Sequence, residues 1–184
     1  MLERPSQSAG ALTLKFRDAI VDEAPQIAAL VNAAYRGESS KQGWTTEAHI
    51  LDGLRTSTHE IQQLIQAENS KIIMCTQGAV LIGAVHVHKT HDTAHIGMFV
   101  VKPQLQNLSI GKQLLTVAES TALQAWQVNK FVMLVITIRH ELIAFYERRG
   151  YKGTGILQVF PVNPKFWMPK VAGLKLERFE KPVE

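Results

Sequence analysis

A short polar loop followed by a helical pattern, in residues 100–115 (VVKPQLQNLSIGKQLL), carries the clearest chemical signal in the chain. The first turn of a helix leaves backbone N–H groups without partners, and the helix dipole favours an anion at that end. Gly111 has no side chain, so a phosphate group can approach the backbone closely, and Lys112 adds positive charge beside it. The segment therefore predicts a cradle for a diphosphate. The alternative is an ordinary loop that begins a helix.

Two common phosphate-binding motifs do not fit this segment. A P-loop needs glycine at position 106 and serine or threonine at position 113, where the chain has Gln106 and Gln113. A dinucleotide-binding fingerprint needs three spaced glycines after a first strand, and here only Gly111 is present. The ligand expected at this loop therefore belongs to another class of phosphorylated molecule.

A second candidate for chemistry lies near the end of residues 131–151 (FVMLVITIRHELIAFYERRGY). An apolar strand leads into a short helix that ends before Gly150, and Tyr146 lies in the last turn of that helix. A tyrosine hydroxyl beside a leaving group can act as a general acid. A packed tyrosine at a helix end is the alternative, and this segment alone leaves both interpretations open.

Hydrophobic periodicity predicts the elements that would position these residues. Alternating or apolar runs predict strands over 12–18, 71–76, 79–88, 94–101, 130–138, 151–160 and 174–181, with the second, third and fourth forming an antiparallel meander. Helical spacing predicts helices over 22–35, 45–54, 109–126 and 140–149, and a short helix that begins at a capping box from Ser57 to Glu60. This mixed order favours an α/β (α+β) sandwich around one sheet.

Length and composition favour a globular protein with one domain. The 184 residues are 46% hydrophobic, and we expect a flexible leader over 1–11 followed by a single domain over 12–184. No apolar stretch is long enough to span a membrane, and the N-terminal residues do not resemble a secretory signal. Cys75 is the only cysteine, which excludes an intrachain disulfide and is compatible with a cytoplasmic location. Its apolar neighbours indicate a buried strand residue rather than a nucleophile.

Charge is distributed unevenly along the chain. Residues 1–101 contain 8 Lys and Arg against 10 Asp and Glu, whereas residues 102–184 contain 12 against 6. A basic C-terminal half suits an anionic ligand. Because no element carries a basic run interleaved with aromatic residues, we expect a phosphorylated cofactor rather than a nucleic acid.

The two motifs together resemble those of the GNAT superfamily of N-acetyltransferases. The first family pattern is Val-x-Pro, then Gln or Arg-x-x-Gly-x-Gly or Ala and paired aliphatic residues, and it is matched at Val101, Pro103, Gln106, Gly111, Leu114 and Leu115. The run from Phe145 to Tyr151 is similar to the second family pattern, Phe/Leu-Tyr-Glu-x-x-Gly-Phe/Tyr. The chain departs from the family at Ser109, where glycine is usual, and at Arg139, where asparagine is frequent. The resemblance spans nearly the whole chain and implies a mixed, mostly antiparallel central sheet flanked by helices.

The resemblance also implies an acetyl-CoA-dependent N-acetyltransferase, which transfers an acetyl group to a primary amine by direct attack in a ternary complex. Tyr146 would be the general acid that protonates the departing thiolate, and no metal is expected. The strand before the phosphate loop would separate from the next strand to admit pantetheine. The cofactor-binding residues expected are Phe99, Val100, Val101, Gln106, Asn107, Leu108, Ser109, Ile110, Gly111, Lys112 and Arg139. A coenzyme A-binding sensor or regulatory module with weak catalysis is the alternative.

Four histidines cluster on the predicted hairpin, at positions 86, 88, 91 and 95. If His88 pairs with Thr93, His86 faces His95 across the strands. A solvated hairpin face is favoured over a metal site, because no carboxylate or cysteine completes the set. His86 or His95 is also a candidate for the base that deprotonates the acceptor ammonium, since an imidazole titrates in a suitable range.

Glu47, beside Trp44, is another candidate base, and both are candidate acceptor-site residues. The aromatic segment that contains Phe160, Phe166 and Trp167 is expected to form a loop over the acceptor site, and a packed loop before the last strand is the alternative. The residues do not identify the acceptor, so small amines, amino acids, aminoglycosides and protein amines all stay open. The expected partner is therefore a small-molecule or peptide amine, with no nucleic acid and no membrane, bound by a monomer or homodimer.

Overall fold

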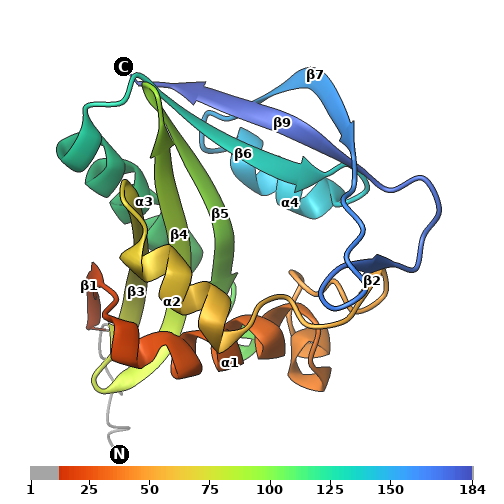
Figure 1. Ribbon diagram of the computed structural model, residues 1–184, viewed down its shortest axis with the longest axis horizontal. Coiled ribbons are helices and arrows are strands. Elements are labelled where there is room, and N and C mark those ends of the chain that lie inside the picture. Colours follow the sequence, from red (N-terminus) through yellow and green to blue (C-terminus); the bar gives the residue numbers. More distant parts are fainter. Residues whose placement is uncertain (1–12, 184) are drawn as a thin grey trace, which may run out of the picture.

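The structure, a computed structural model, describes residues 13–183, so the predicted leader over 1–11 lies outside the described residues. A seven-stranded sheet in the order β1-β3-β4-β5-β6-β9-β7 has helices on both faces (Figure 1). Its strands are β1 (Leu14–Asp18), β3 (Ser70–Gln77), β4 (Val80–Thr90), β5 (Thr93–Val101), β6 (Lys130–Ile136), β7 (Lys152–Val159) and β9 (Lys175–Pro182). The short strands β2 (Leu51–Asp52) and β8 (Met168–Pro169) form a separate pair.

The helices are α1 (Ala24–Tyr35), α2 (Thr58–Gln66), α3 (Ile110–Trp126) and α4 (His140–Glu147), with short 3-10 helices η1 (Val21–Glu23), η2 (Glu38–Gln42) and η3 (Pro103–Leu105). Every neighbouring pair in the large sheet is antiparallel except β5 and β6. The predicted mixed α/β fold with a mostly antiparallel sheet is therefore confirmed. Within residues 13–183, no helix has the length and apolar character needed to cross a membrane.

One predicted helix, over 45–54, is wrong. The segment instead forms turns and β2. Its backbone folds around Glu47, whose N–H donates to the Tyr35 carbonyl at 2.7 Å and whose carbonyl accepts from the N–H groups of Ile50 and Leu51. Threonine and histidine in this segment are modest helix formers, so these contacts and the burial of the Glu47 side chain override the apolar spacing.

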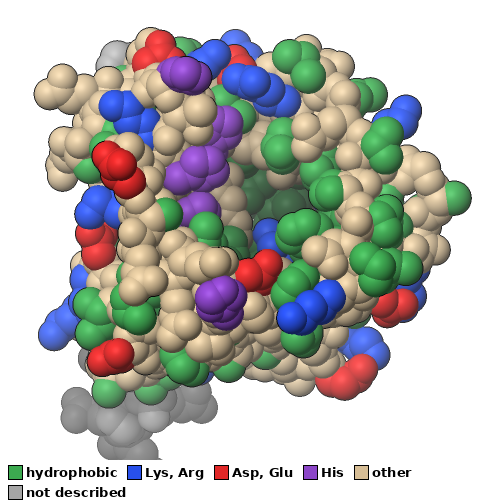
Figure 2. All heavy atoms as spheres, in the orientation of Figure 1, with side chains coloured by type: hydrophobic (Ala, Val, Ile, Leu, Met, Phe, Trp, Pro, Cys, Tyr) green, Lys and Arg blue, Asp and Glu red, His purple; other side chains and the backbone are tan. Residues whose placement is uncertain are grey.

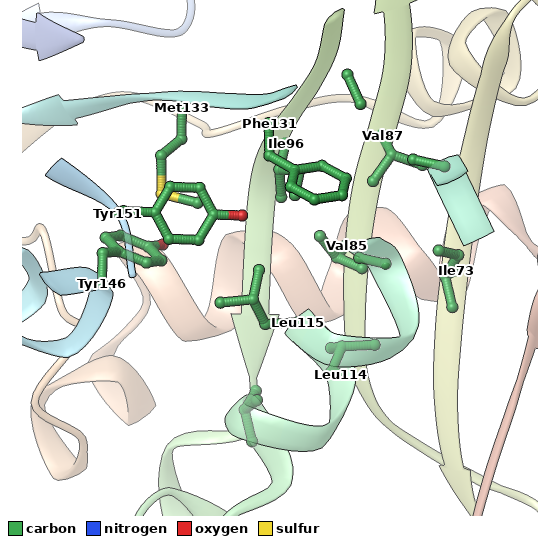
Figure 3. Packing of buried hydrophobic residues seen from close by; sticks show 14 of the residues in the cluster. Ile73, Val85, Val87, Ile96, Leu114, Leu115, Phe131, Met133, Tyr146 and Tyr151 are labelled. Carbon is green, nitrogen blue, oxygen red and sulfur yellow. The ribbon is translucent and has the colours of Figure 1, made fainter. Parts of the chain in front are cut away.

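Two hydrophobic clusters hold the layers together on opposite faces of the sheet. On one face, α1 and α2 bury residues such as Ile27, Val31 and Ile61 against β3 and β4. On the other face, Leu114 and Leu115 of α3 pack near residues of the sheet, as Figure 3 shows. The predicted capping box begins α2: Glu60 N–H donates to Ser57 Oγ at 3.2 Å, and Ser57 N–H donates to Glu60 Oε2 at 3.0 Å.

The parallel strands β5 and β6 pair at one end only and then separate. Thr93, Ala94 and His95 are the β5 residues in register with β6, and Figure 1 shows the two strands diverging from there. β5 also contains a bulge, because its register against β4 shifts between Ala84 and His86 and Met98 has a φ of 44°. The strand separation expected beside the phosphate loop is therefore present, and it leaves one edge of β5 without a strand partner.

Candidate active site

Two cavities meet at the gap between β5 and β6. The larger, about 510 Å³, lies against the N-terminus of α3 and against α4, and we call it the α3 cavity. The smaller, about 250 Å³, lies against β6 and the 160–176 segment, and we call it the β6 cavity. Figure 2 shows the molecule hollowed near its centre, with hydrophobic side chains in the hollow and on one side of it and histidine side chains along the other side. The residues that line both cavities form the junction: Tyr35, Phe99, Arg139, Leu142 and Tyr146.

The N-terminus of α3 opens into the α3 cavity. Ser109 is the N-cap residue, and its φ of 61° is the left-handed conformation that glycine adopts without a steric cost. This backbone conformation explains why glycine is usual at this position in the family that the motif resembles. The first N–H groups of the helix have no partner within it. A Cβ on Gly111 would lie 3.6 Å from both Phe99 Cζ and Phe145 Cζ, so the missing side chain leaves space between the helix and two aromatic rings.

Positive charge surrounds the α3 cavity. Lys112, Arg148 and Arg149 line it, against a single lining carboxylate, Glu141, among the described residues. The Arg149 guanidinium carbon lies 3.4 Å from the Phe145 ring centroid, and Arg149 Nη1 donates to the Phe145 carbonyl at 2.5 Å. The sequence analysis did not single out Arg148 and Arg149 as cavity residues, although their position inside the second motif could have pointed to them. The cavity has the charge and the helix terminus that a diphosphate requires.

Gln106 and Arg139, both predicted as cofactor-binding residues, line the α3 cavity. Their side chains also form hydrogen bonds with the loop over residues 44–47. Gln106 Oε1 accepts from Trp44 N–H at 3.0 Å, and its Nε2 donates to Thr45 Oγ1 at 2.7 Å. Arg139 is 8% exposed, and it donates to Glu47 Oε1 at 3.1 Å and to the Thr45 carbonyl at 2.8 Å. The structure therefore gives both side chains a part in shaping the cavity wall.

The remaining predicted residues fall on both sides of the junction or outside it. Leu108 is exposed and Ile110 is buried in the core, and neither lines the α3 cavity. Trp44 lines the α3 cavity rather than the β6 cavity, whereas Glu47 lines the β6 cavity. The predicted cofactor residues that do line the α3 cavity are Phe99, Val100, Val101, Gln106, Asn107, Ser109, Gly111, Lys112 and Arg139.

Tyr146 lies at the junction and is 6% exposed. Its ring centroid is 5.4 Å from that of Phe145, 6.0 Å from that of Tyr151 and 6.4 Å from that of Phe99. Burial raises the pKa of Tyr146 above its ordinary value. The hydroxyl therefore keeps its proton throughout the neutral pH range, as a proton donor must.

Tyr35 is a junction residue to which no sequence pattern pointed. It is the last residue of α1, and its hydroxyl donates to the Phe99 carbonyl at 2.8 Å. This bond joins α1 to the bulged part of β5. An aromatic residue at the end of an amphipathic helix is ordinarily read as packing, which is why its place at the junction was not foreseen.

A buried charge cluster of Arg36, Glu47 and Arg139 lines the β6 cavity. Glu47 Oε1 lies 3.1 Å from Arg139 Nη1, and Glu47 Oε2 lies 3.6 Å from Arg36 Nη2. All three side chains are less than a tenth exposed, and burial lowers the pKa of Arg36. Arg36 Nη1 also lies within hydrogen-bond distance of four backbone carbonyl oxygens, which share its two N–H donors: those of Asp52, Gly53, Leu54 and Phe166.

The hairpin histidines lie in a register that differs from the predicted one. Thr90 pairs with Thr93 across a two-residue tip, so His88 faces His95 and His86 faces Gly97. The tip is short because His91 adopts a φ of 55°, which the local sequence does not require.

The three rings stack, with centroids 5.2 Å apart for His86 and His88 and 4.9 Å apart for His88 and His95. His86 and His95 line neither cavity. Among the described residues, no group of three His, Cys, Asp or Glu side chains is placed to hold a metal ion.

The histidine stack is expected to make stability depend on pH. Burial lowers the pKa of His86 to about 4 and also lowers the pKa values of His88 and His95. A histidine in an unfolded chain titrates near about 6.5, so the unfolded state binds protons that the folded state does not. The free energy of unfolding is therefore not reduced by these histidines above about pH 6.5, and it falls as the pH drops toward about 4. His86 alone should account for a loss of roughly 2–3 kcal/mol.

Urea denaturation of the wild type and of His86→Gln at about pH 7 and pH 4.5 measures this effect, and the variant should lose less stability on acidification. His59→Gln, which changes an exposed histidine of α2, is the matched control and should behave as the wild type. Equal losses in the wild type and His86→Gln would contradict the prediction.

The sheet therefore opens between two parallel strands, and a helix N-terminus and a buried tyrosine lie at the opening. The chain belongs to the acetyltransferase (GNAT) domain family, which it matches over residues 38–161. It is therefore an acyltransferase of the N-acetyltransferase class, a family that uses acetyl-CoA. A comparison with curated proteins found no match.

Solved structures show the same fold at low sequence identity. An IAA acetyltransferase from Bacillus cereus is 16% identical with a TM-score of 0.63, over 93% of this chain and 100% of that chain. The ribosomal-protein-S18-alanine N-acetyltransferase from Escherichia coli is 14% identical with a TM-score of 0.67, over 94% of this chain and 95% of that one. A chimeric spermidine N-acetyltransferase, in part from Vibrio cholerae, is 17% identical with a TM-score of 0.65, over 92% and 95%.

Proposed function

We propose that the chain binds acetyl-CoA in the α3 cavity and transfers its acetyl group to a primary amine held in the β6 cavity. The observation that carries this proposal is the junction, where a cavity suited to a diphosphate meets a second cavity beside Tyr146. The family's use of acetyl-CoA supports the assignment of the larger cavity.

The residues around the α3 cavity fit this cofactor. Backbone N–H groups of Gly111 and Lys112 in the first turn of α3 would hold the diphosphate, with the Lys112, Arg148 and Arg149 charges beside it. The edge of β5 beyond His95 has no pairing with β6, so its backbone is available to the pantetheine amides. This path ends near Phe99 at the junction.

The proposed chemistry is direct transfer. The neutral amine attacks the thioester carbonyl carbon, a nitrogen–carbon bond forms, and the carbon–sulfur bond breaks. Tyr146 donates a proton to the leaving thiolate, and the amine nitrogen loses a proton to a base or to water. Among the candidate bases, Glu47 is the one that lines the β6 cavity, and its Oε2 makes no hydrogen bond with the described residues.

Release of free thiol from acetyl-CoA in the presence of a panel of amines tests the proposed function. The panel covers amino acids, polyamines, an aminoglycoside and short peptides, and thiol release above the rate with water is the expected result. Tight acetyl-CoA binding without thiol release for any amine would favour the alternative, a coenzyme A-binding sensor or regulatory module.

Gly111→Val is expected to weaken acetyl-CoA binding by at least about tenfold, because two added methyl groups beside the Cβ would occupy the space between α3 and the Phe99 and Phe145 rings. Calorimetry measures the affinity, and circular dichroism confirms that the variant is folded. Thr116→Val places the same side chain on an exposed position of α3 outside the cavity, and it should bind as the wild type does. Unchanged affinity in a folded Gly111→Val would reject the site.

A further inference from the structure

The β6 cavity carries more positive than negative charge. The charged residues that line it are Arg36, Arg55, Arg139 and Glu47. Glu47 is the ion-pair partner of Arg139 and Arg36. Within the part of the chain that the structure describes, no carboxylate lies within 4 Å of the Arg55 side chain. Three guanidinium groups and one carboxylate give the cavity a net positive charge, which favours an anionic group on the ligand.

Arg55 lies close to the junction, where the amine must react. Its guanidinium carbon is 5.4 Å from the ring centroid of Tyr35, a junction residue. Its backbone N–H donates to Asn32 Oδ1 at 2.7 Å, which ties the residue to α1. Burial lowers the pKa of Arg36, and the positive charge of Arg55 lowers it further, so the two arginines are close enough to repel each other. Arg36 Nε is buried and has no hydrogen-bond partner among residues 13–183.

The rest of the β6 cavity is mainly apolar. Leu134 of β6 lines it and is 48% exposed, so a ligand could cover this side chain favourably. Phe160 and Trp167, from the aromatic segment expected over the acceptor site, lie in the same lining. The other apolar lining residues include Leu51, Met133, Ile136 and Leu176. The cavity therefore offers a ligand both an apolar wall and Arg55, a cation without an ion-pair partner among the described residues.

We propose, resting on the acetyl transfer proposed above, that the acceptor is an amine that carries a carboxylate and an apolar side chain, as an apolar amino acid does. Arg55 binds the carboxylate, because a guanidinium group recognises a carboxylate with paired hydrogen bonds. Leu134, Phe160 and Trp167 contact the apolar side chain. A polyamine is a poor acceptor here, since its second ammonium group would meet the Arg55 charge in a partly buried cavity.

The test compares leucine and phenylalanine with leucinamide and phenylalaninamide as acceptors, by kcat/KM for thiol release. Each pair shares a side chain, and the amide lacks the carboxylate charge; because the amine of the amide is also less basic, the rates are compared per neutral amine. The acids should exceed the amides by at least about tenfold, the value of a hydrogen bond to a charged group. Arg55→Gln should remove most of this preference by lowering kcat/KM for the acids, and Arg55→Lys should keep part of it. Arg17→Gln removes an arginine of β1 that lines neither cavity and should change nothing.

The outcomes separate this inference from the proposed function. Thiol release that is equal for acids and amides, or equal losses for both in Arg55→Gln, would overturn the inference and leave acetyl transfer intact. If no amine releases thiol, the proposed function fails, and calorimetry of leucine against leucinamide then decides the inference. Leucine binding that is lost in Arg55→Gln would support a carboxylate site, and equal binding of acid and amide would refute it.

Discussion

Replacing Glu47 with glutamine is expected to lower the free energy of unfolding by roughly 3–5 kcal/mol, the usual cost of removing one partner from a buried ion pair. The substitution keeps the size and shape of the side chain and removes only its charge. Arg36 and Arg139 would then lie close together, less than a tenth exposed, without a counter-charge. Urea denaturation measures the loss as a lower midpoint with an unchanged slope.

The matched control is Glu38→Gln. Glu38 forms an ion pair with Lys41, but both side chains are more than half exposed, so water already screens that pair. We expect no measurable change in stability for this variant. A loss of less than about 1 kcal/mol in Glu47→Gln, comparable to an exposed pair, would mean that water or a rearranged loop compensates the two arginines.

The elements with the strongest local patterns could be predicted from the sequence. The helix over 109–126 and the meander over 71–101 depend on spacing within a single segment, and the structure contains them as α3 and as β3, β4 and β5. The strand separation at the gap was expected from the resemblance to the family, and the pairing of only three β5 residues with β6 agrees with it. The cavity that contains Gly111 and Lys112 follows from these elements.

The buried charge cluster could not be predicted, because its members lie far apart in the sequence. Glu47 and Arg139 were predicted as site residues, but no local pattern pairs them with each other or with Arg36, and only tertiary folding brings the three together. The same applies to Arg55, whose place in the β6 cavity follows from its attachment to α1. The failed helix over 45–54 has this origin as well, since Glu47 is buried between the two arginines instead of lying on a helix surface.

Replacing Tyr146 with phenylalanine is expected to lower kcat by at least about tenfold and by up to about 10⁴, the range for a general acid, while acetyl-CoA affinity changes little. The ring and its packing against Phe99, Phe145 and Tyr151 are kept, and only the hydroxyl is lost. Steady-state kinetics measures the turnover number, and calorimetry measures the affinity. Tyr151→Phe is the matched control: its hydroxyl bonds to Glu119 in the core and lines neither cavity, so stability should fall while kcat is kept.

Two further measurements distinguish a general acid at Tyr146 from a tyrosine that only lines the cavity. An acyl donor with a more acidic thiol needs less help in leaving, so the loss in Tyr146→Phe should shrink with such a donor. A general acid acts only while protonated, so its activity disappears above its pKa. Burial raises the pKa of Tyr146 above the ordinary value of about 10, and kcat should therefore show no loss from this group up to about pH 10. Wild-type turnover in Tyr146→Phe would leave the tyrosine as a packed aromatic, and the thiolate would then take its proton from water or from another side chain.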